Sequence, residues 1–187
     1  VRHTRVPSIG QWGLARDDGG RFLFSKNWNP AIGLFVPPGY LGAVHQDLRA
    51  SMTGAARPGG DYQSVWPAMV TPDLQEGPGA ARQGDGTLSR FTSACGQTFF
   101  RGDRLGEGVT GDYFLCEPVG RLVRRSKVDY LDTGHLELAN LHEHDIGEFI
   151  TSTDGNFRPV NCHTGPDGCL YLVDMYHGII QERSYLT

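Results

Sequence analysis

Short runs of apolar and β-branched residues recur along the chain, separated by turns rich in glycine, proline and aspartate. The clearest example has three strand-like runs, at Pro159–Thr164, Cys169–Met175 and Ile179–Arg183. The first two are joined by Gly165–Gly168, in which proline sets the first corner, aspartate bonds its own backbone and glycine accepts a positive φ. The bend Tyr176–Gly178 joins the second run to the third. This pattern predicts an antiparallel meander, the unit from which a β-propeller blade is made.

An earlier segment repeats this pattern more weakly. Within residues 12–36, the turn Asp17–Gly20 corresponds to Gly165–Gly168 of the later meander. The apolar run Phe22–Phe24 likewise corresponds to Leu170–Leu172. Two copies of one meander favour radial repetition, although an Asp-Gly turn between apolar strands also occurs in other β proteins. No segment shows a long 3.6-residue period, so the sequence predicts an all-β domain.

The rest of the chain is less regular. Residues from about 45 to 86 have few alternating runs, and a segment of this length is usually functional or a linker. Its apolar spots at Val65–Val70 favour a loop that covers a surface, with a flexible tether as the alternative. Strand-like runs resume at Phe91–Phe100, with an interruption at Cys95–Gly96, and at Tyr113–Cys116. The run Arg121–Tyr130 is predicted to be a solvated outer strand whose cations protect an edge, with a polyanion site as the alternative.

Charge and hydropathy exclude several classes of partner. The net charge is −4 and the pI is about 5.9, which argues against a nucleic-acid or anionic-membrane partner. The longest apolar window, Ala31–Val44, is broken by Pro37–Gly39 and is too short to span a bilayer. No signal peptide is visible. The chain runs from Val1 to Thr187 and stops just after a strand-like run, so we expect a fragment of a longer protein.

The four cysteines, Cys95, Cys116, Cys162 and Cys169, form neither a CxxC pair nor a haem-attachment motif. We expect them to be small buried hydrophobes. A Cys95–Cys116 disulfide between neighbouring strands is the alternative, and it would require an oxidising compartment. Zinc is not expected.

The histidines do not define a metal site. The segment His135–His144 fits either a strand or a short helix, and on a strand His142 and His144 would share one face. Without a third ligand at recognisable spacing, no metal site is predicted, and no DxDxDG calcium loop occurs. His163 lies in the innermost strand predicted for the best meander and is the candidate catalytic base, with a hydrogen-bonded core histidine as the alternative.

Four motifs, in order along the chain, carry a resemblance to a known family. They are Ala94–Gly96 with Arg101–Asp103, Gly111–Pro118, Glu148–Phe149 with Ser152–Asp154 and Phe157–Val160, and Gly165–Gly168 with Leu170–Tyr171 and Asp174–Tyr176. With these motifs the chain resembles the propeller domain of the large membrane-bound dehydrogenases of planctomycetes and verrucomicrobia. The resemblance covers most of Trp12–Leu186 and is poor from about residue 50 to 80. His177 and Cys169 depart from the family pattern, which has arginine and alanine there.

The family is related in fold to the soluble quinoprotein glucose/sorbosone dehydrogenases, and many members carry a separate c-type haem domain. The resemblance therefore implies a β-propeller of about six blades, of which this chain is an incomplete fragment of about three to four. It implies a sugar or alcohol substrate, pyrroloquinoline quinone and Ca²⁺ as cofactors, and haem c only in a domain outside this chain. The implied partners are the remaining blades and the haem domain, in the periplasm or cell envelope.

A quinone-dependent oxidation needs a general base, cations for the carboxylates of the quinone, and usually a Ca²⁺ that polarises a quinone carbonyl. The resemblance puts the candidates among the polar residues of the motifs, around the propeller channel: Arg101, Asp103, Glu117, Asp154, Arg158 and Asp174. Asp154 and Arg158 are predicted to form a bidentate pair, either at the channel mouth or tying a blade corner. Glu117 either faces the channel or completes a turn, and Arg101 and Asp103 are expected to stabilise a loop.

Two functions remain open from the sequence. An oxidoreductase requires the base and the cations to converge at one end of the channel. The alternative, a propeller that binds carbohydrate or protein without turnover, is favoured if those residues point apart into blade corners. A third interpretation is a structural part of a larger enzyme whose site lies elsewhere.

Overall fold

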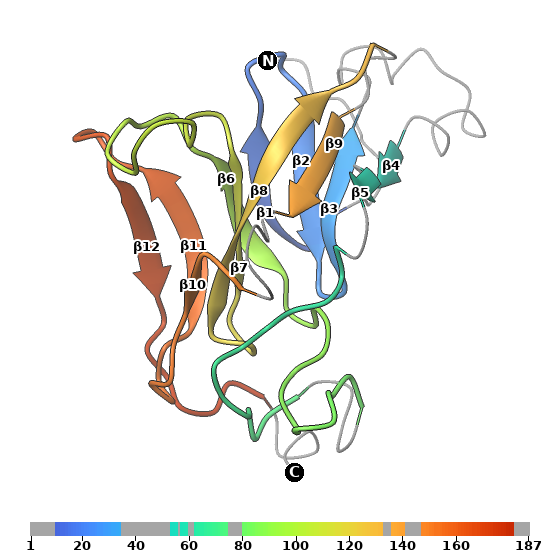
Figure 1. The fold of residues 1–187 in the computed structure, drawn as a ribbon, viewed down its shortest axis with the longest axis vertical. Coiled ribbons are helices and arrows are strands. Elements are labelled where there is room, and N and C mark those ends of the chain that lie inside the picture. The colour runs from blue at the N-terminus through green and yellow to red at the C-terminus, as the bar shows by residue number, and fades with distance from the viewer. Residues whose placement is uncertain are drawn as a thin grey trace, which may run out of the picture.

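The structure is a computed structural model that describes residues 10–34, 53–55, 57–59, 62–74, 80–132, 136–140 and 147–181. These residues form strands and turns and contain no helix, so the predicted all-β class is confirmed (Figure 1). The strands are β1 (Trp12–Arg16), β2 (Phe22–Lys26), β3 (Asn29–Leu34), β4 (Thr53–Ala55), β5 (Arg57–Gly59), β6 (Cys95–Phe99), β7 (Tyr113–Glu117), β8 (Leu122–Tyr130), β9 (Leu136–Asn140), β10 (Ile150–Thr151), β11 (Pro159–Thr164) and β12 (Leu170–Asp174).

The strands form three sheets. β1 to β4 make the first sheet in chain order, with every neighbouring pair antiparallel. β6 to β9 make the second in the same way, with β5 added parallel to β9 and β10 antiparallel to β8. β11 and β12 form the third, joined by the predicted turn Gly165–Gly168. Alternation along this hairpin turns Cys162 and Leu172 toward the second sheet and leaves His163 and Tyr171 exposed.

The opening strands of the three sheets lie side by side. β6 contacts β1 on one side and β11 on the other, so the second sheet stands between the first and the third (Figure 1). Two glycines with positive φ allow this close approach. A Cβ on Gly13 (φ +72) would lie 2.5 Å from Oε1 of Gln97, and a Cβ on Gly96 (φ +58) would lie 2.1 Å from the carbonyl oxygen of Val160. The backbones at both junctions are therefore closer than any side chain permits.

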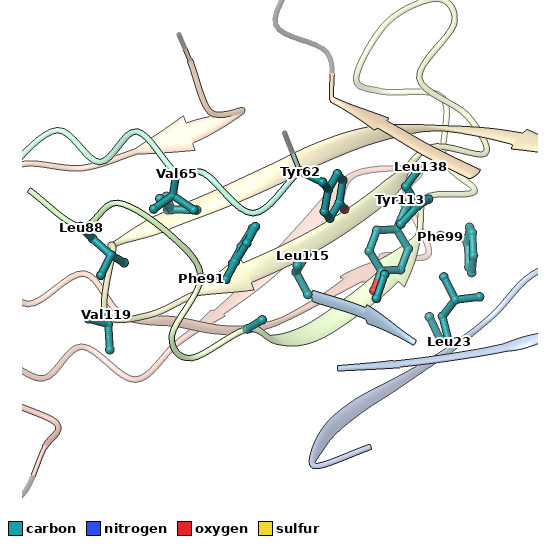
Figure 2. Packing of buried hydrophobic residues seen from close by; sticks show 14 of the residues in the cluster. Leu23, Tyr62, Val65, Leu88, Phe91, Phe99, Tyr113, Leu115, Val119 and Leu138 are labelled. Carbon is teal, nitrogen blue, oxygen red and sulfur yellow. The ribbon is translucent and has the colours of Figure 1, made fainter. Parts of the chain in front are cut away.

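The larger apolar core lies between the first two sheets and the segments that lead into β6 (Figure 2). The first sheet contributes Leu23, and the second contributes Tyr113 and Leu115, all fully or almost fully buried. The Tyr113 hydroxyl donates a hydrogen bond to the carbonyl oxygen of Pro30 at 3.1 Å, which satisfies the one polar atom of this ring. Each such buried side chain contributes about 1.5–3 kcal/mol relative to an exposed one.

A second apolar core joins the second sheet to the hairpin. Phe114 lies at its centre and makes edge-to-face contacts with Phe100 at 5.9 Å and with Phe149 at 5.0 Å between ring centroids. Cys116 and Cys162 are buried in the same cluster. The expectation that cysteines fill the core is confirmed for these two residues.

Arg124 of β8 anchors the loop that covers the second sheet. Its guanidinium is buried, bonds Glu148 through Nε at 2.9 Å, and donates to the carbonyl oxygen of Tyr62 at 2.6 Å. The rings of Tyr62, Trp66 and Phe91 surround it at 4.6 to 5.5 Å. The described residues 62–74 thus pack on the protein. The prediction of an irregular segment over about 45–86 is wrong for residues 53–55 and 57–59, which pair with β3 and β9 as strands β4 and β5.

The predicted role of the Arg121–Tyr130 run is wrong. β8 lies inside its sheet, between β7 and β9, and Arg121 and Arg124 are buried. Arg125 and Lys127 both pair with buried Asp112, at 2.6 and 3.1 Å. Cations are tolerated in this run because each finds a carboxylate or carbonyl partner.

Two other sequence expectations need correction. The strand predicted from Phe91 begins only at Cys95, because the backbone N–H groups of Thr92 and Ser93 donate to Glu117. No strand forms at residues 179–181, where the third run of the meander was expected, because the backbone there bonds a buried polar network; residues 182–183 lie outside the described residues. β9 shows that the described part of the ambiguous 135–144 segment is a strand.

Candidate functional site

A cavity of about 680 Å³ opens where β1, β6 and β11 begin and where the chain leaves β12. Its wall contains both polar and apolar side chains, and the described residues that line it include no Asp, Glu, Lys, Arg or His. The larger side chains of its wall include Trp12, Asn27, Ser93, Asn161, Met175 and Gln181. The cavity is therefore suited to an uncharged ligand that has both an apolar face and hydrogen-bonding groups.

Trp12 is the largest side chain of the cavity wall and is 52% exposed. Its indole Nε1 donates to Oδ1 of Asn27 at 2.9 Å, which fixes the ring against the β2–β3 turn. The Ser25 hydroxyl donates to the Trp12 carbonyl oxygen and lies 3.1 Å from Oε1 of Gln97, so the backbone beneath the ring is held as well. An aromatic face is thus presented in a fixed orientation.

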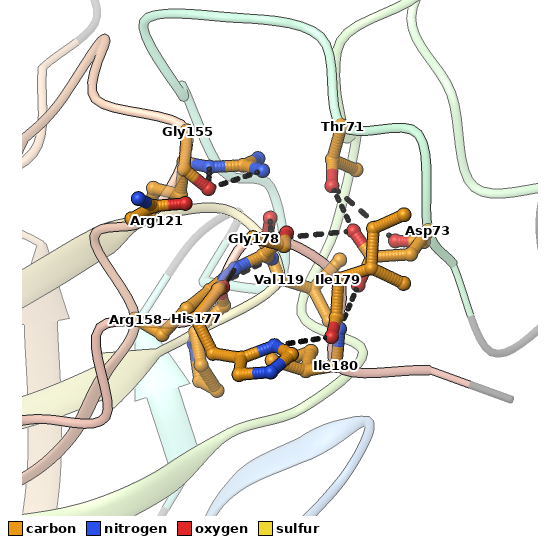
Figure 3. Close-up of polar contacts among 12 residues, drawn as sticks. Thr71, Asp73, Val119, Arg121, Gly155, Arg158, His177, Gly178, Ile179 and Ile180 are labelled. Carbon is orange, nitrogen blue, oxygen red and sulfur yellow. Dashed lines mark hydrogen bonds and ion pairs between the residues drawn. The ribbon is translucent and has the colours of Figure 1, made fainter.

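Behind the cavity wall, Arg158 holds a buried polar network (Figure 3). Its guanidinium donates to Oδ1 of Asp73 at 2.9 Å, to the carbonyl oxygens of Pro118 and His177 at 3.0 Å each, and to that of Gly178. Pro118 also lines the cavity. Arg158 therefore positions the cavity wall without reaching into the cavity.

Asp73 is the carboxylate of this network and is fully buried. It accepts from the backbone N–H of Ile180, a cavity residue, and from the Thr71 hydroxyl, both at 2.8 Å. Burial opposes ionisation, but these hydrogen bonds and the nearby charge of Arg158 outweigh it and hold the pKa of Asp73 below its usual range. The pair is ionised and positions the chain after β12.

Arg121 is the second buried cation beside this network. Its Nε and Nη2 both donate to the carbonyl oxygen of Gly155 at 3.1 Å, whereas Nη1 has no protein partner among the described residues. Burial and the positive charge of Arg158 lower the pKa of Arg121. Arg121 was expected to be a solvated cation of an outer strand, and Asp73 gave no signal because it lies in a segment without a regular pattern.

Glu117 ends β7 and is fully buried. Its carboxylate accepts the backbone N–H groups of Thr92 at 3.0 Å, Ser93 at 2.7 Å and Val119 at 3.2 Å. Burial raises the pKa of Glu117 to about 7, against the opposing effect of these hydrogen bonds. Glu117 closes a turn and does not line the cavity. Of the two roles expected for this residue, the geometry therefore agrees with the completion of a turn.

This environment predicts a pH-dependent stability. Because the folded pKa of Glu117, about 7, exceeds its ordinary value of 4.5, folding favours the protonated form. The associated stability is complete below pH 4.5 and is lost as the pH rises through 7, by up to about 3 kcal/mol. Urea unfolding from pH 4.5 to 8 measures this slope, and Glu117→Gln is expected to abolish the contribution. An identical slope in the variant would assign it to other groups.

Arg101 and Asp103 lie at the opposite end of the opening strands from the cavity. The Arg101 backbone N–H donates to the Thr164 hydroxyl at 2.9 Å, and its guanidinium bonds exposed Asp18 at 2.9 Å. Asp103 is exposed, beside the β11–β12 turn, in a separate hollow of about 630 Å³. Arg101 therefore ties two loops together, whereas the carboxylate of Asp103 lies 3.8 Å from its chain neighbour Arg104.

The remaining predicted site residues are Asp154, Asp174 and the predicted base His163, and they do not form one cluster. Asp154 does not pair with Arg158 and instead accepts the Asn156 backbone N–H at 2.9 Å, so the predicted bidentate pair is wrong. Asp174 accepts the Arg158 backbone N–H at 2.7 Å and caps the end of β12. His163 is exposed on β11 and does not line the cavity, which also excludes the core-histidine alternative.

The described residues offer neither a metal-binding cluster nor a membrane-spanning helix. His135, His142 and His144 lie outside the described residues. Elsewhere, no group of three or more His, Cys, Asp or Glu side chains in the described part of the chain is arranged to hold a metal ion. No helix among the described residues is long and apolar enough to cross a membrane.

The described part of the chain defines an all-β protein of packed antiparallel sheets, with an uncharged cavity where their opening strands begin. Residues 2–187 match the model of a family described as a domain of unknown function (DUF7133), and the chain belongs to that family. Comparison with the curated proteins and with the solved structures finds no match.

Proposed function

We propose that this chain is part of a β-propeller in which each antiparallel meander is one blade. The support is topological: two meanders have four strands in chain order, and β1, β6 and β11 lie next to one another as the innermost strands of neighbouring blades do. Innermost strands of neighbouring blades pack closely, which explains why Gly13 of β1 and Gly96 of β6 leave no room for a Cβ atom.

The outward faces of the first and third sheets support further blades. Leu14 is 54% exposed on the face of β1 opposite Ala15, which packs into the core. Tyr171 and Val173 are similarly exposed on β12. Clustered exposed apolar side chains of this kind mark contact surfaces. We propose that the remaining blades of the same protein cover them and that a c-type haem domain is a further partner in the cell envelope.

The proposed activity is non-catalytic binding of an uncharged carbohydrate. The observation that carries it is the cavity, in which the oriented indole of Trp12 lies beside the amide side chains of Asn27, Asn161 and Gln181. A sugar ring presents apolar C–H groups to an aromatic face and hydroxyl groups to amides, and it needs no charged partner.

The quinone expected from the family resemblance does not fit this cavity. Its carboxylates require cations, and the described lining offers none, while Arg158 is bonded behind the wall. The other candidate residues also serve backbone or loop contacts. No catalytic step through a quinone is therefore derived, and the oxidation of sugars or alcohols stays a prediction from the resemblance.

Titration of the purified chain with neutral saccharides tests the proposal. We expect cellobiose or glucose to change the tryptophan fluorescence saturably, with a Kd of about 1 mM, and to release heat in calorimetry. Trp12→Ala should weaken the affinity at least about tenfold, because it removes the aromatic face. Trp28→Ala is the matched control, since Trp28 is 61% exposed but does not line the cavity.

Two results would contradict carbohydrate binding. One is the absence of saturable calorimetric binding across a panel of neutral sugars by a chain whose circular dichroism shows a folded β protein. The other is tighter binding of pyrroloquinoline quinone, with or without Ca²⁺, than of any neutral sugar, which would return the cavity to the oxidoreductase hypothesis.

A further inference from the structure

Two thiols lie beside one backbone carbonyl in the second apolar core. The Sγ atom of Cys162, on β11, lies 3.1 Å from the carbonyl oxygen of Gly96, and the Sγ atom of Cys116, on β7, lies 3.8 Å from the same oxygen. The Cys162 thiol also lies 3.8 Å from the carbonyl oxygen of Phe114, two residues before Cys116 on β7, and both cysteines belong to one buried apolar cluster. Cys95 packs on the edge of this cluster.

We infer that Cys116 and Cys162 form a disulfide when the chain folds in the presence of a small-molecule disulfide oxidant. The bond would join the second sheet to the hairpin across the core that Phe114 fills. Both residues are fully buried and free in the reduced form, and both sulfur atoms lie beside the carbonyl oxygen of Gly96. This inference is independent of carbohydrate binding.

The geometry favours this pair over the others. Cys95 lies opposite Cys116 in the β6–β7 ladder, but the register is irregular between Cys95 and Thr98, and Cys95 also forms part of the cavity wall. Cys169 follows the hairpin turn, where its backbone N–H bonds Asp167, and it does not belong to the apolar cluster. Cys162 is therefore the residue whose sulfur shares a carbonyl contact with that of Cys116.

The oxidation balances as two thiol–disulfide exchanges. One thiolate attacks the oxidant R–S–S–R, forms a mixed disulfide and releases one thiolate, which takes up a proton. The second protein thiolate then attacks the mixed disulfide, forms the Cys116–Cys162 bond and releases the second R–SH. The protein loses two protons and two electrons, and the oxidant R–S–S–R gains the two protons and the two electrons.

The folded state protects these thiols from later reaction. The neighbouring Cys162 thiol, together with burial, raises the pKa of the Cys116 thiol, so little of the reactive thiolate is present once the core has closed. We therefore expect the bond to form during folding and to form slowly in a chain that is already folded.

Refolding the unmodified chain in oxidised and reduced glutathione tests the inference. Free thiols are then blocked with N-ethylmaleimide, and the protein is digested and mapped by mass spectrometry. We expect two of the four thiols to be lost and the peptides that contain Cys116 and Cys162 to be linked. Four blocked thiols, or a linkage from Cys95 to Cys116, would overturn the inference. No variant has to fold for this result.

Stability and a control variant provide the second readout. The oxidised chain should melt about 5–10 °C above the same chain treated with dithiothreitol, because the cross-link restricts the unfolded state. Cys95→Ser should keep both the linked peptides and this shift. If Cys95→Ser abolished them, Cys95 would be a member of the bond and the assigned pair would be wrong.

Discussion

The chain with Gly96→Ala is expected to lose at least about 4 kcal/mol of its free energy of unfolding, a large part of the stability of an ordinary domain. Gly96 has φ +58, and a Cβ there would lie 2.1 Å from the carbonyl oxygen of Val160 and 2.4 Å from Cα of Asn161. These are backbone atoms, so no rotation of a side chain relieves the overlap. β6 and β11 would have to separate, which opens both the second core and the cavity.

Urea unfolding followed by circular dichroism measures this loss. Gly106→Ala is the matched control, because Gly106 also has a positive φ (+98), but a Cβ at this position would meet no atom within 4 Å. The control should cost only the conformational penalty of about 1 kcal/mol. Equal losses in the two variants would show that the junction of β6 and β11 is looser than the structure indicates.

The sequence predicted the parts of the fold that local chemistry determines. The turn Gly165–Gly168 forms where proline, aspartate and glycine require it, and its flanking runs become β11 and β12. The weaker copy near Asp17–Gly20 also proves to be a hairpin turn, between β1 and β2. In both places the hydrogen bonds that define the turn join residues within a few positions of one another, so a short window of sequence contains the whole cause.

The errors arise where a charged side chain meets a partner far away in the sequence. Arg124 looked like a solvated edge cation, yet it is buried against Glu148 and three aromatic rings. The carboxylate that pairs with Arg158 comes from Asp73, 85 positions earlier, in a segment without a regular pattern. Nothing in the spacing of these residues indicates the pairing, because it exists only after the three sheets have packed.

The same reasoning explains why the predicted site residues failed to form a catalytic cluster. Motif positions were the natural candidates for chemistry, but Glu117 and Arg158 use their polar atoms to bind backbone groups that the irregular segments leave without strand partners. Without these side chains, buried N–H and C=O groups would lack partners, at about 1–3 kcal/mol each. Trp12 and the amide side chains of the cavity could not be predicted as a binding site from the sequence, because neutral side chains near turns are common in any β protein.

The variant Arg158→Met is expected to lower the free energy of unfolding by about 3–5 kcal/mol. Methionine replaces part of the apolar volume, but it leaves the carboxylate of Asp73 buried without its cation and the carbonyl oxygens of Pro118 and His177 without donors. The same change should weaken sugar binding, since Pro118 of the cavity wall would lose its donor and Asp73, which holds Ile180, would lose its cation.

A double-mutant cycle distinguishes this network from a general loss of packing. Asp73→Asn removes the buried charge, so the double variant with Arg158→Met should be more stable than the sum of the two single losses predicts, by about 1–3 kcal/mol. The excess loss of Arg158→Met should also shrink as the pH falls and Asp73 becomes protonated, since the pKa of this carboxyl is depressed only while Arg158 and the hydrogen bonds are present. Arg104→Met is the surface control: that side chain is 69% exposed and lies 3.8 Å from Asp103, so its loss should stay below about 0.5 kcal/mol. Strict additivity at every pH would show that Arg158 and Asp73 stabilise the protein separately, and the network behind the cavity would then not act as a unit.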